Sequence, residues 1–213
     1  MLNFLNFKKK TPEKQFWKWF VENKNELEKL ITTDTEDYSV YNTLTAELKK
    51  YNEYLFPEIT TTEKGVFVLV ITPDGIKKGV LPTQNLFDAK PEIEHWIVKK
   101  FRQPNNAIDL NFDGVEYPSS DIEILPEVDA EKGKINIRLF IRNMDEDEKK
   151  YQSLAWLYLD HILGEFNTIT KIGFIEFFNV EADKCIIDSI SILELRDLIE
   201  KEIYKVNSSF ISK

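Results

Sequence analysis

The stretch that decides the fold reads Leu154-Ala-Trp-Leu-Tyr-Leu-Asp-His-Ile-Leu163, with Gly164-Glu165 directly after it. A helix that is apolar on every side is buried on every side, so the stretch predicts a helix covered by other elements. Gly164 is the expected C-terminal stop. Asp160 and His161 lie together near that end, and a buried ionisable doublet needs either hydrogen-bond partners or a function.

The chain around this helix predicts strands and one further helix. Apolar residues alternate with polar ones from Lys134 to Asn143, which predicts a hairpin with Asp121–Val128 through Gly133. The segment Ile169–Val180 is apolar on both faces, as expected for a central strand. The capping box Ser191-Ile-Leu-Glu194 predicts that a last helix begins there.

The N-terminal part of the chain predicts a pair of helices. Thr11-Pro12 supplies an N-cap and a proline at the first helical position. Apolar residues then recur near the helical period from Phe16 to Ile31. A second amphipathic helix is expected over Tyr41–Leu55, and the short connection predicts that the two helices pack as a hairpin.

Strands are expected to follow these helices. Phe56–Thr60 predicts a strand in which Pro57 is typical of a sheet edge. Val66–Ile71, the turn Thr72-Pro-Asp-Gly75 and the following Ile76–Val80 together predict a β-hairpin. Glu94–Phe101 is expected to be another strand.

The order of these elements predicts an α+β fold. A mostly antiparallel sheet is expected to be covered by the N-terminal helical hairpin and by two C-terminal helices. No linker rich in Gly, Ser or Pro interrupts the chain, so we expect residues 1–213 to form a single α+β domain.

Composition narrows the classes of function. The chain has 213 residues, a net charge of −9 and a sequence pI near 4.9. Phosphate-backbone binding needs clustered Lys and Arg, so nucleic acid is not an expected partner. The negative charge favours either a basic protein partner or plain solubility.

Cysteine use and hydropathy predict a cytoplasmic protein. Cys185 is the single cysteine, which excludes an internal disulfide and fits a reducing compartment. Its apolar neighbours Ile186-Ile187 predict a buried thiol. The longest clean apolar run, Val66–Ile71, is far too short to span a bilayer, so no membrane association is expected.

The sequence predicts no metal site and no cofactor. Asp109-Leu-Asn-Phe-Asp-Gly114 matches the first half of a calcium-binding EF-hand loop, but Ser120 occupies the position of the bidentate Glu. A tight hairpin turn at Asp113-Gly114 is favoured instead. His95 and His161 are the only histidines, which excludes a His-rich zinc site. Nucleophile-elbow, phosphate-loop and dinucleotide motifs are also absent from the sequence.

Candidate catalytic or ligand-binding residues are therefore limited to Asp160, His161 and Glu165. A histidine in the last turn of a helix also interacts favourably with the negative helix end, so a structural role is the favoured interpretation. Glu176 is either a buried carboxylate in a central strand or lies at an exposed strand end. Trp17 and Trp19 lie about 200° apart on a helix, so both cannot face one core, and one could meet a partner protein.

Three segments carry a resemblance to a known group of proteins. They are Phe16-Trp-Lys-Trp-Phe20, the Pro73-Asp-Gly75 turn with the later Ala89–Trp96, and Leu159-Asp-His-Ile-Leu-Gly-Glu165. On these the chain resembles, over most of its length, an uncharacterised bacterial family of cytoplasmic α+β proteins. The resemblance implies one domain and bacterial origin, and it implies no activity, cofactor or catalytic residue.

Two hypotheses of function follow. The first is a non-catalytic interaction domain, such as an acidic inhibitor or an immunity-type partner of a basic protein. The second is a small hydrolase or ligand-binding domain with a pocket around Asp160, His161 and Glu165. The sequence favours the first and leaves an enzyme open.

Overall fold

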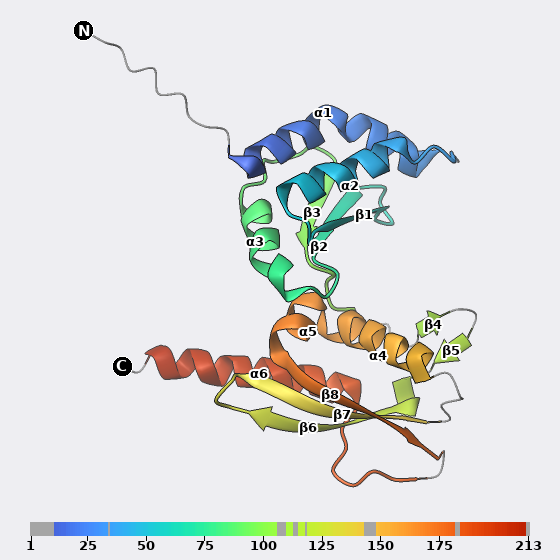
Figure 1. The fold of residues 1–213 in the computed structure, drawn as a ribbon, viewed down its shortest axis with the longest axis vertical. Coiled ribbons are helices and arrows are strands. Elements are labelled where there is room, and N and C mark those ends of the chain that lie inside the picture. Colours follow the sequence, from blue (N-terminus) through green and yellow to red (C-terminus); the bar gives the residue numbers. More distant parts are fainter. Residues whose placement is uncertain are drawn as a thin grey trace. The chain divides into compact units, whose positions relative to one another are not determined.

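The computed structural model describes residues 11–33, 35–105, 110–112, 115–117, 119–142, 148–181 and 184–211. It confirms the α+β class, with mostly antiparallel strand pairs arranged in two three-stranded sheets and one two-stranded pair (Figure 1). The chain divides into two compact units, Met1–Phe101 and Arg102–Lys213, which we call unit 1 and unit 2. The single domain over residues 1–213 stays a prediction.

Unit 1 begins with the predicted helical pair. The first helix starts where Thr11-Pro12 placed it, because the Thr11 hydroxyl accepts the backbone N–H of Lys14 at 3.4 Å. Its elements are α1 (Pro12–Thr32), α2 (Ser39–Tyr51), β1 (Phe56–Thr61), β2 (Phe67–Thr72), the 3-10 turn η1 (Lys77–Gly79), α3 (Val80–Asp88) and β3 (Trp96–Lys100). Strand β1 lies at the edge of the sheet, as Pro57 predicted.

The predicted hairpin through Pro73-Asp74-Gly75 is wrong. Strand β2 pairs antiparallel with the preceding β1 and parallel with β3, and the chain after the turn winds into η1 and α3. Thr83 and Leu86 are buried three residues apart, which is helical spacing. The segment Ile76–Val80, in which Ile76 and Val80 are the apolar residues, therefore belongs to a helical crossover, which so short a pattern could not distinguish from a strand.

Unit 2 contains the second three-stranded sheet. Its elements are β4 (Leu110–Phe112), β5 (Val115–Tyr117), the 3-10 turn η2 (Ser119–Asp121), β6 (Ile122–Asp129), β7 (Lys134–Arg142), α4 (Glu148–Leu163), α5 (Glu165–Lys171), β8 (Ile172–Val180) and α6 (Ile192–Ile211). The β6–β7 hairpin is confirmed, and so is the capping box, in which Ser191 and Glu194 exchange hydrogen bonds. Strands β4 and β5 pair antiparallel around the predicted turn, but Asp109, Asp113 and Gly114 lie outside the described residues.

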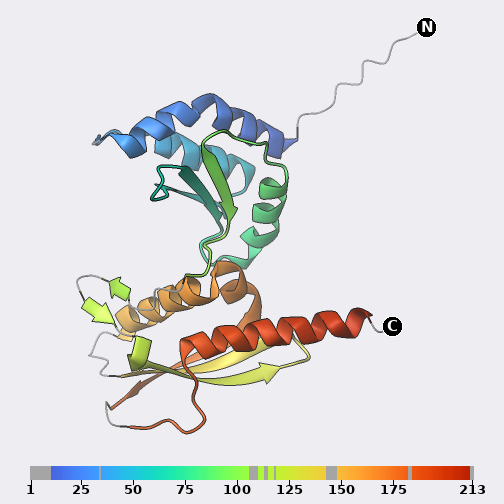
Figure 2. The ribbon, with the colours of Figure 1, turned by 180° about the vertical axis from the view of Figure 1, so that it is seen from behind.

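One face of the unit 2 sheet forms the core. Residues alternate along β7 between buried and accessible positions, and the buried ones join a single cluster with α4 and α6. Both helices therefore lie on the same side of the sheet (Figure 2). We call the other side the open face, and its register places these residues on it: Leu125, Glu127, Asn136, Arg138, Phe140, Phe174, Glu176 and Phe178.

Strand β8 is an edge strand and not the predicted central strand. The strand order is β6-β7-β8, with β8 parallel to β7. Ile175 and Phe177 pack against the core, whereas Phe174 and Phe178 on the alternate positions are exposed. Both faces of β8 carry apolar residues, and this predicted that both would be buried. In the structure one face is buried and the other is accessible.

The two units differ in charge. Unit 1 contains 15 Lys and Arg residues and 15 Asp and Glu residues, so its charges cancel. The whole net charge of −9 therefore belongs to unit 2.

Candidate functional site

The buried polar cluster of unit 2 is built on the junction between α4 and α5. Gly164 ends α4 with a φ of 77°, as its C-terminal stop, and α5 begins at the next residue. A Cβ on Gly164 would lie 2.8 Å from Cδ of Pro104, so glycine is required both by the backbone conformation and by this close approach. The segment Arg102–Asn105 thus runs against the junction, and the N–H of Asn105 donates to the carbonyl of His161 at 2.7 Å.

Glu165 holds this segment in place through hydrogen bonds. Its side chain is fully buried, and its Oε2 accepts the backbone N–H of Arg102 at 3.1 Å. The backbone N–H of Glu165 in turn donates to the Arg102 carbonyl at 3.0 Å. This reciprocal pair satisfies polar groups that would be costly to bury alone.

Asp160 pairs with the Arg102 side chain. The Nη1 of Arg102 lies 3.3 Å from Oδ2 of Asp160, and the carboxylate is mostly buried, with 17% of its side chain exposed. Burial, and then the Glu165 carboxylate, raise the pKa of Asp160 from its ordinary 3.8 to about 6, while Arg102 and Thr168 oppose this rise. Burial therefore outweighs the ion pair at this group.

His161 has a buried ring nitrogen. Its Nε2 is buried and makes no hydrogen bond within the described part of the chain. Asp160, His161 and Glu165, the three candidates from the sequence, thus belong to one junction. Sequence reasoning missed Arg102, which lies 58 residues before Asp160 and carries no local signal.

The hollows beside the α1–α2 connection, beside Phe174 and at the β6–β7 turn are lined by other residues than Asp160, His161 and Glu165. Together, the contacts of these residues define a clasp (Arg102, Asp160, Gly164 and Glu165) that holds the segment Arg102–Asn105 on the α4–α5 junction.

The open face is the second candidate site. Phe174 is 65% exposed and Phe178 is 39% exposed, and Glu176 lies exposed between them on β8. Phe178 stacks on Phe140 of β7 with ring centroids 5.1 Å apart. A hollow of about 220 Å³ lies beside Phe174 and Glu176. Exposed aromatic residues on an uncovered sheet face, one of them lining a hollow, are typical of a protein-binding surface.

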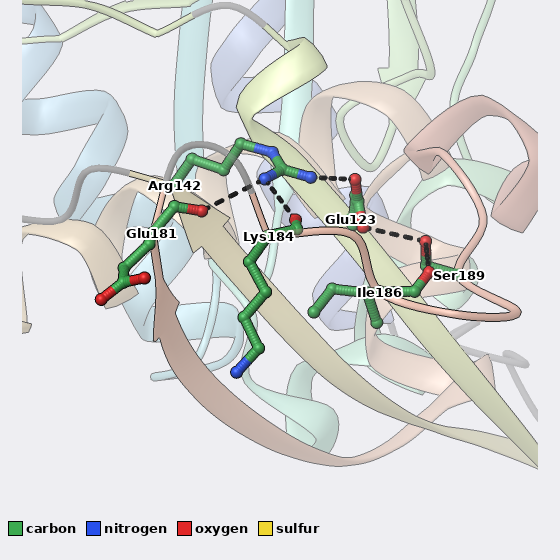
Figure 3. Close-up of polar contacts among 6 residues, drawn as sticks. All are labelled: Glu123, Arg142, Glu181, Lys184, Ile186 and Ser189. Atoms are coloured by element: carbon green, nitrogen blue, oxygen red, sulfur yellow. Dashed lines mark hydrogen bonds and ion pairs between the residues drawn. The ribbon is translucent and has the colours of Figure 1, made fainter.

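Residues 184–191 of the connection between β8 and α6 are held by polar contacts with Glu123 of β6 and Arg142 of β7 (Figure 3). Arg142 forms an ion pair with Glu123 and donates from Nη1 to the carbonyls of Lys184, at 2.7 Å, and Glu181, at 3.3 Å. The Ser189 hydroxyl lies 2.9 Å from Oε2 of the same Glu123. The network fixes a loop whose Ile187 is 80% exposed.

Cys185 lies on this loop and is exposed, which corrects the expectation of a buried thiol. Ile186-Ile187, its apolar neighbours, do not bury the thiol, because Ile187 is itself 80% exposed and the carbonyl of Ile186 accepts the Ser189 hydroxyl within the loop.

The two tryptophans that were interaction candidates have different environments. Trp17 is 2% exposed, and its indole N–H donates to the carbonyl of Leu86 at 2.8 Å, so it belongs to the unit 1 core. Trp19 is half-buried at the margin of that core and lines a hollow beside the α1–α2 connection. The two side chains, which were predicted to face different directions, therefore both lie against parts of unit 1.

Comparison with known proteins gives no assignment: no family model, no curated protein and no solved structure matches this chain. Among the described residues, no helix has the length and apolar character needed to cross a membrane. The same part of the chain has no group of three or more His, Cys, Asp or Glu side chains arranged for a metal ion.

Proposed function

We propose that this protein is a non-catalytic interaction protein that binds a basic protein partner through the open face of unit 2, as an acidic inhibitor or immunity-type partner would. The observation that carries the proposal is the pair of exposed phenylalanines, Phe174 and Phe178, on a sheet face that α4 and α6 leave uncovered. Interface energy usually concentrates in a few such aromatic side chains.

Charge supports the choice of a basic partner. Unit 2 holds the whole net charge of −9, so a second copy of the chain would be repelled at this surface and a cationic protein would be attracted. The residues on either side of Ile187 are held by hydrogen bonds from Arg142 to the Lys184 carbonyl and from Ser189 to Glu123, which lowers the conformational entropy lost on binding.

Affinity capture from an extract of the source organism tests this proposal. The baits are the wild-type chain, the double variant Phe174→Ser/Phe178→Ser, and a control, Val21→Ser/Ile97→Ser, which removes two exposed apolar side chains from unit 1. We expect a stoichiometric partner of high pI that the wild type and the control retain and the phenylalanine variant loses. Absence of such a partner, or its retention by the phenylalanine variant, would contradict the proposal.

A hydrolase or ligand-binding domain around Asp160, His161 and Glu165 is the second candidate. The raised pKa of Asp160, about 6, favours it, because a general acid or base works best near neutral pH. Hydrolase activity would need the Asp160 carboxyl to reach a substrate, so Asp160→Asn would abolish turnover in an activity screen. Turnover that survives this substitution would exclude Asp160 from the chemistry.

A further inference from the structure

A hollow of about 280 Å³ lies in unit 2, at the end of the sheet where the turn joins β6 to β7. The α5–β8 junction and α6 complete its wall, and these elements meet at the same end of the sheet in both ribbon views (Figures 1 and 2). Neither the clasp nor the open face contributes its named residues to this hollow.

Three lysines line this hollow. The charge of Lys132 is matched by Asp129, whose Oδ2 lies 2.8 Å from the Lys132 Nζ. Lys134 is held in place because its Nζ donates to the carbonyls of Ile169 and Ile172, each at 3.3 Å. Lys171 is half-buried, and its side chain has no hydrogen bond or ion pair with any other described residue. The described lining therefore holds more positive than negative charge.

The rest of the wall is apolar. Ile135 and Ile199 are almost fully buried and form its inner part, and Val128, which is 45% exposed, lies at its margin. A ligand that fits this wall has an apolar body and places its charge beside Lys171 and Lys134.

Helix capping explains only part of this arrangement. Cations near the C-terminal end of a helix are favourable, and Lys134 donates to the carbonyl of Ile169 in α5 and to that of the C-cap residue Ile172. Lys171 makes no such contact, although it is the last residue of α5. The side-chain charge of this half-buried residue is therefore available to a counter-ion outside the described chain.

We propose that this hollow binds a small organic anion with an apolar body, of which a medium-chain carboxylate is the simplest member. The carboxylate would accept hydrogen bonds from Lys171, with Lys134 supplying a second positive charge, and the alkyl chain would cover Val128, Ile135 and Ile199. The proposal stands independently of the partner that binds the open face.

Isothermal titration of the full chain with three probes tests the site. Octanoate carries both the charge and the apolar body, octan-1-ol lacks the charge, and acetate lacks the body. We expect 1:1 binding of octanoate that is at least tenfold tighter than that of either other probe, because both parts of the site are used. Equal binding of octanoate and octan-1-ol, or no binding of octanoate, would overturn the proposal.

Variants locate the binding. Lys171→Met removes the charge and keeps an apolar stem, so we expect about a tenfold loss of octanoate affinity and unchanged octan-1-ol binding. Lys184→Met, which removes a lysine of the same unit that does not line the hollow, is the matched control and should change neither. If Lys171→Met does not fold, Val128→Asp at the exposed margin places a like charge near the carboxylate and should weaken octanoate selectively. Octanoate binding that survives every folded variant would place its site elsewhere and refute the proposal.

Discussion

In both units an antiparallel hairpin is followed by a helical crossover to a parallel third strand. Unit 1 makes this crossover with α3 between β2 and β3, and unit 2 makes it with α4 and α5 between β7 and β8. The short α3 has no buried carboxylate, whereas the longer crossover breaks at Gly164 over Asp160 and Glu165. The shared plan shows that such a crossover can form without a clasp, so the clasp is specific to unit 2.

The same comparison applies to exposed aromatic residues and charge. In unit 1, the ammonium group of Lys49 lies 3.2 Å from the ring centroid of Phe56 and covers it. Tyr38 of unit 1 is nevertheless 58% exposed, compared with 65% for Phe174 of unit 2, so exposed aromatic residues occur in both units. The net charge does not, because unit 2 carries all of it. The net charge is not needed for the shared strand order, and that is why we place the proposed binding function on unit 2.

The largest expected effect on stability comes from a substitution of Gly164, the glycine of the clasp. Gly164→Ala combines a positive φ with a Cβ that would lie 2.8 Å from Pro104, so we expect unit 2 to lose about 3 kcal/mol of unfolding free energy. A fluorophore on Cys185, the single cysteine, reports the unfolding of unit 2 in urea. The control is Gly133→Ala, which also has a positive φ but would have no atom within 4 Å of its Cβ, so its loss should be about 1 kcal/mol. Equal losses in the two variants would show that the contact with Pro104 is unimportant.

A smaller loss is expected from the buried carboxylate. Glu165→Ala leaves the backbone N–H of Arg102 without its acceptor, which should cost about 2 kcal/mol. Glu165→Gln keeps an amide oxygen at that place and should recover most of the loss. The urea midpoint of each variant at pH 7 measures this, and a Gln variant as unstable as the Ala variant would show that the charge, and not the hydrogen bond, stabilises the clasp.

The pH dependence of the unfolding free energy tests the buried carboxylate of the clasp, which unit 1 lacks. The pKa of Asp160 is raised to about 6 in the folded chain, so the folded state binds more protons than the unfolded state between pH 3.8 and about 6. Its contribution to stability therefore falls as the pH rises through that window. Asp160→Asn removes this dependence, and its stability relative to the wild type should increase by roughly 2 kcal/mol from pH 4 to pH 7.5. A difference that does not vary with pH would contradict the raised pKa.

The smallest effect on stability is expected at the proposed binding surface. Phe174→Ser/Phe178→Ser removes side chains that are largely exposed, so unit 2 should lose less than about 1 kcal/mol. The Cys185 fluorophore in urea again measures this. A loss comparable to that of Gly164→Ala would mean that these rings stabilise the sheet. The loss of partner capture in the double variant would then be explained by unfolding of unit 2, without any contact between the rings and the partner.

The sequence predicted the elements whose signals are local. The proline that begins α1, the alternation along β7, the Ser191–Glu194 capping box and the stop at Gly164 all depend on residues within a few positions. The edge position of β8 could not be read, because a strand with Phe174 and Phe178 on its open face has the same pattern as one buried on both faces.

The clasp was predicted only in part, for a related reason. Asp160, His161 and Glu165 are close in sequence and could be selected together. Arg102, the partner of Asp160 and Glu165, comes from a segment 58 residues before Asp160, and only the folded chain brings it there. Its backbone N–H, which Glu165 binds, carries no sequence signature at all.

Hydrogen exchange of the chain with and without its captured basic partner tests the central claim, that the open face is the binding surface, most directly. The account predicts that the partner slows exchange in β8 and in the described β8–α6 loop around Ile187, and leaves the α4–α5 junction unchanged. Slower exchange confined to that junction, around Asp160 and Glu165, would contradict it and move the function to the clasp.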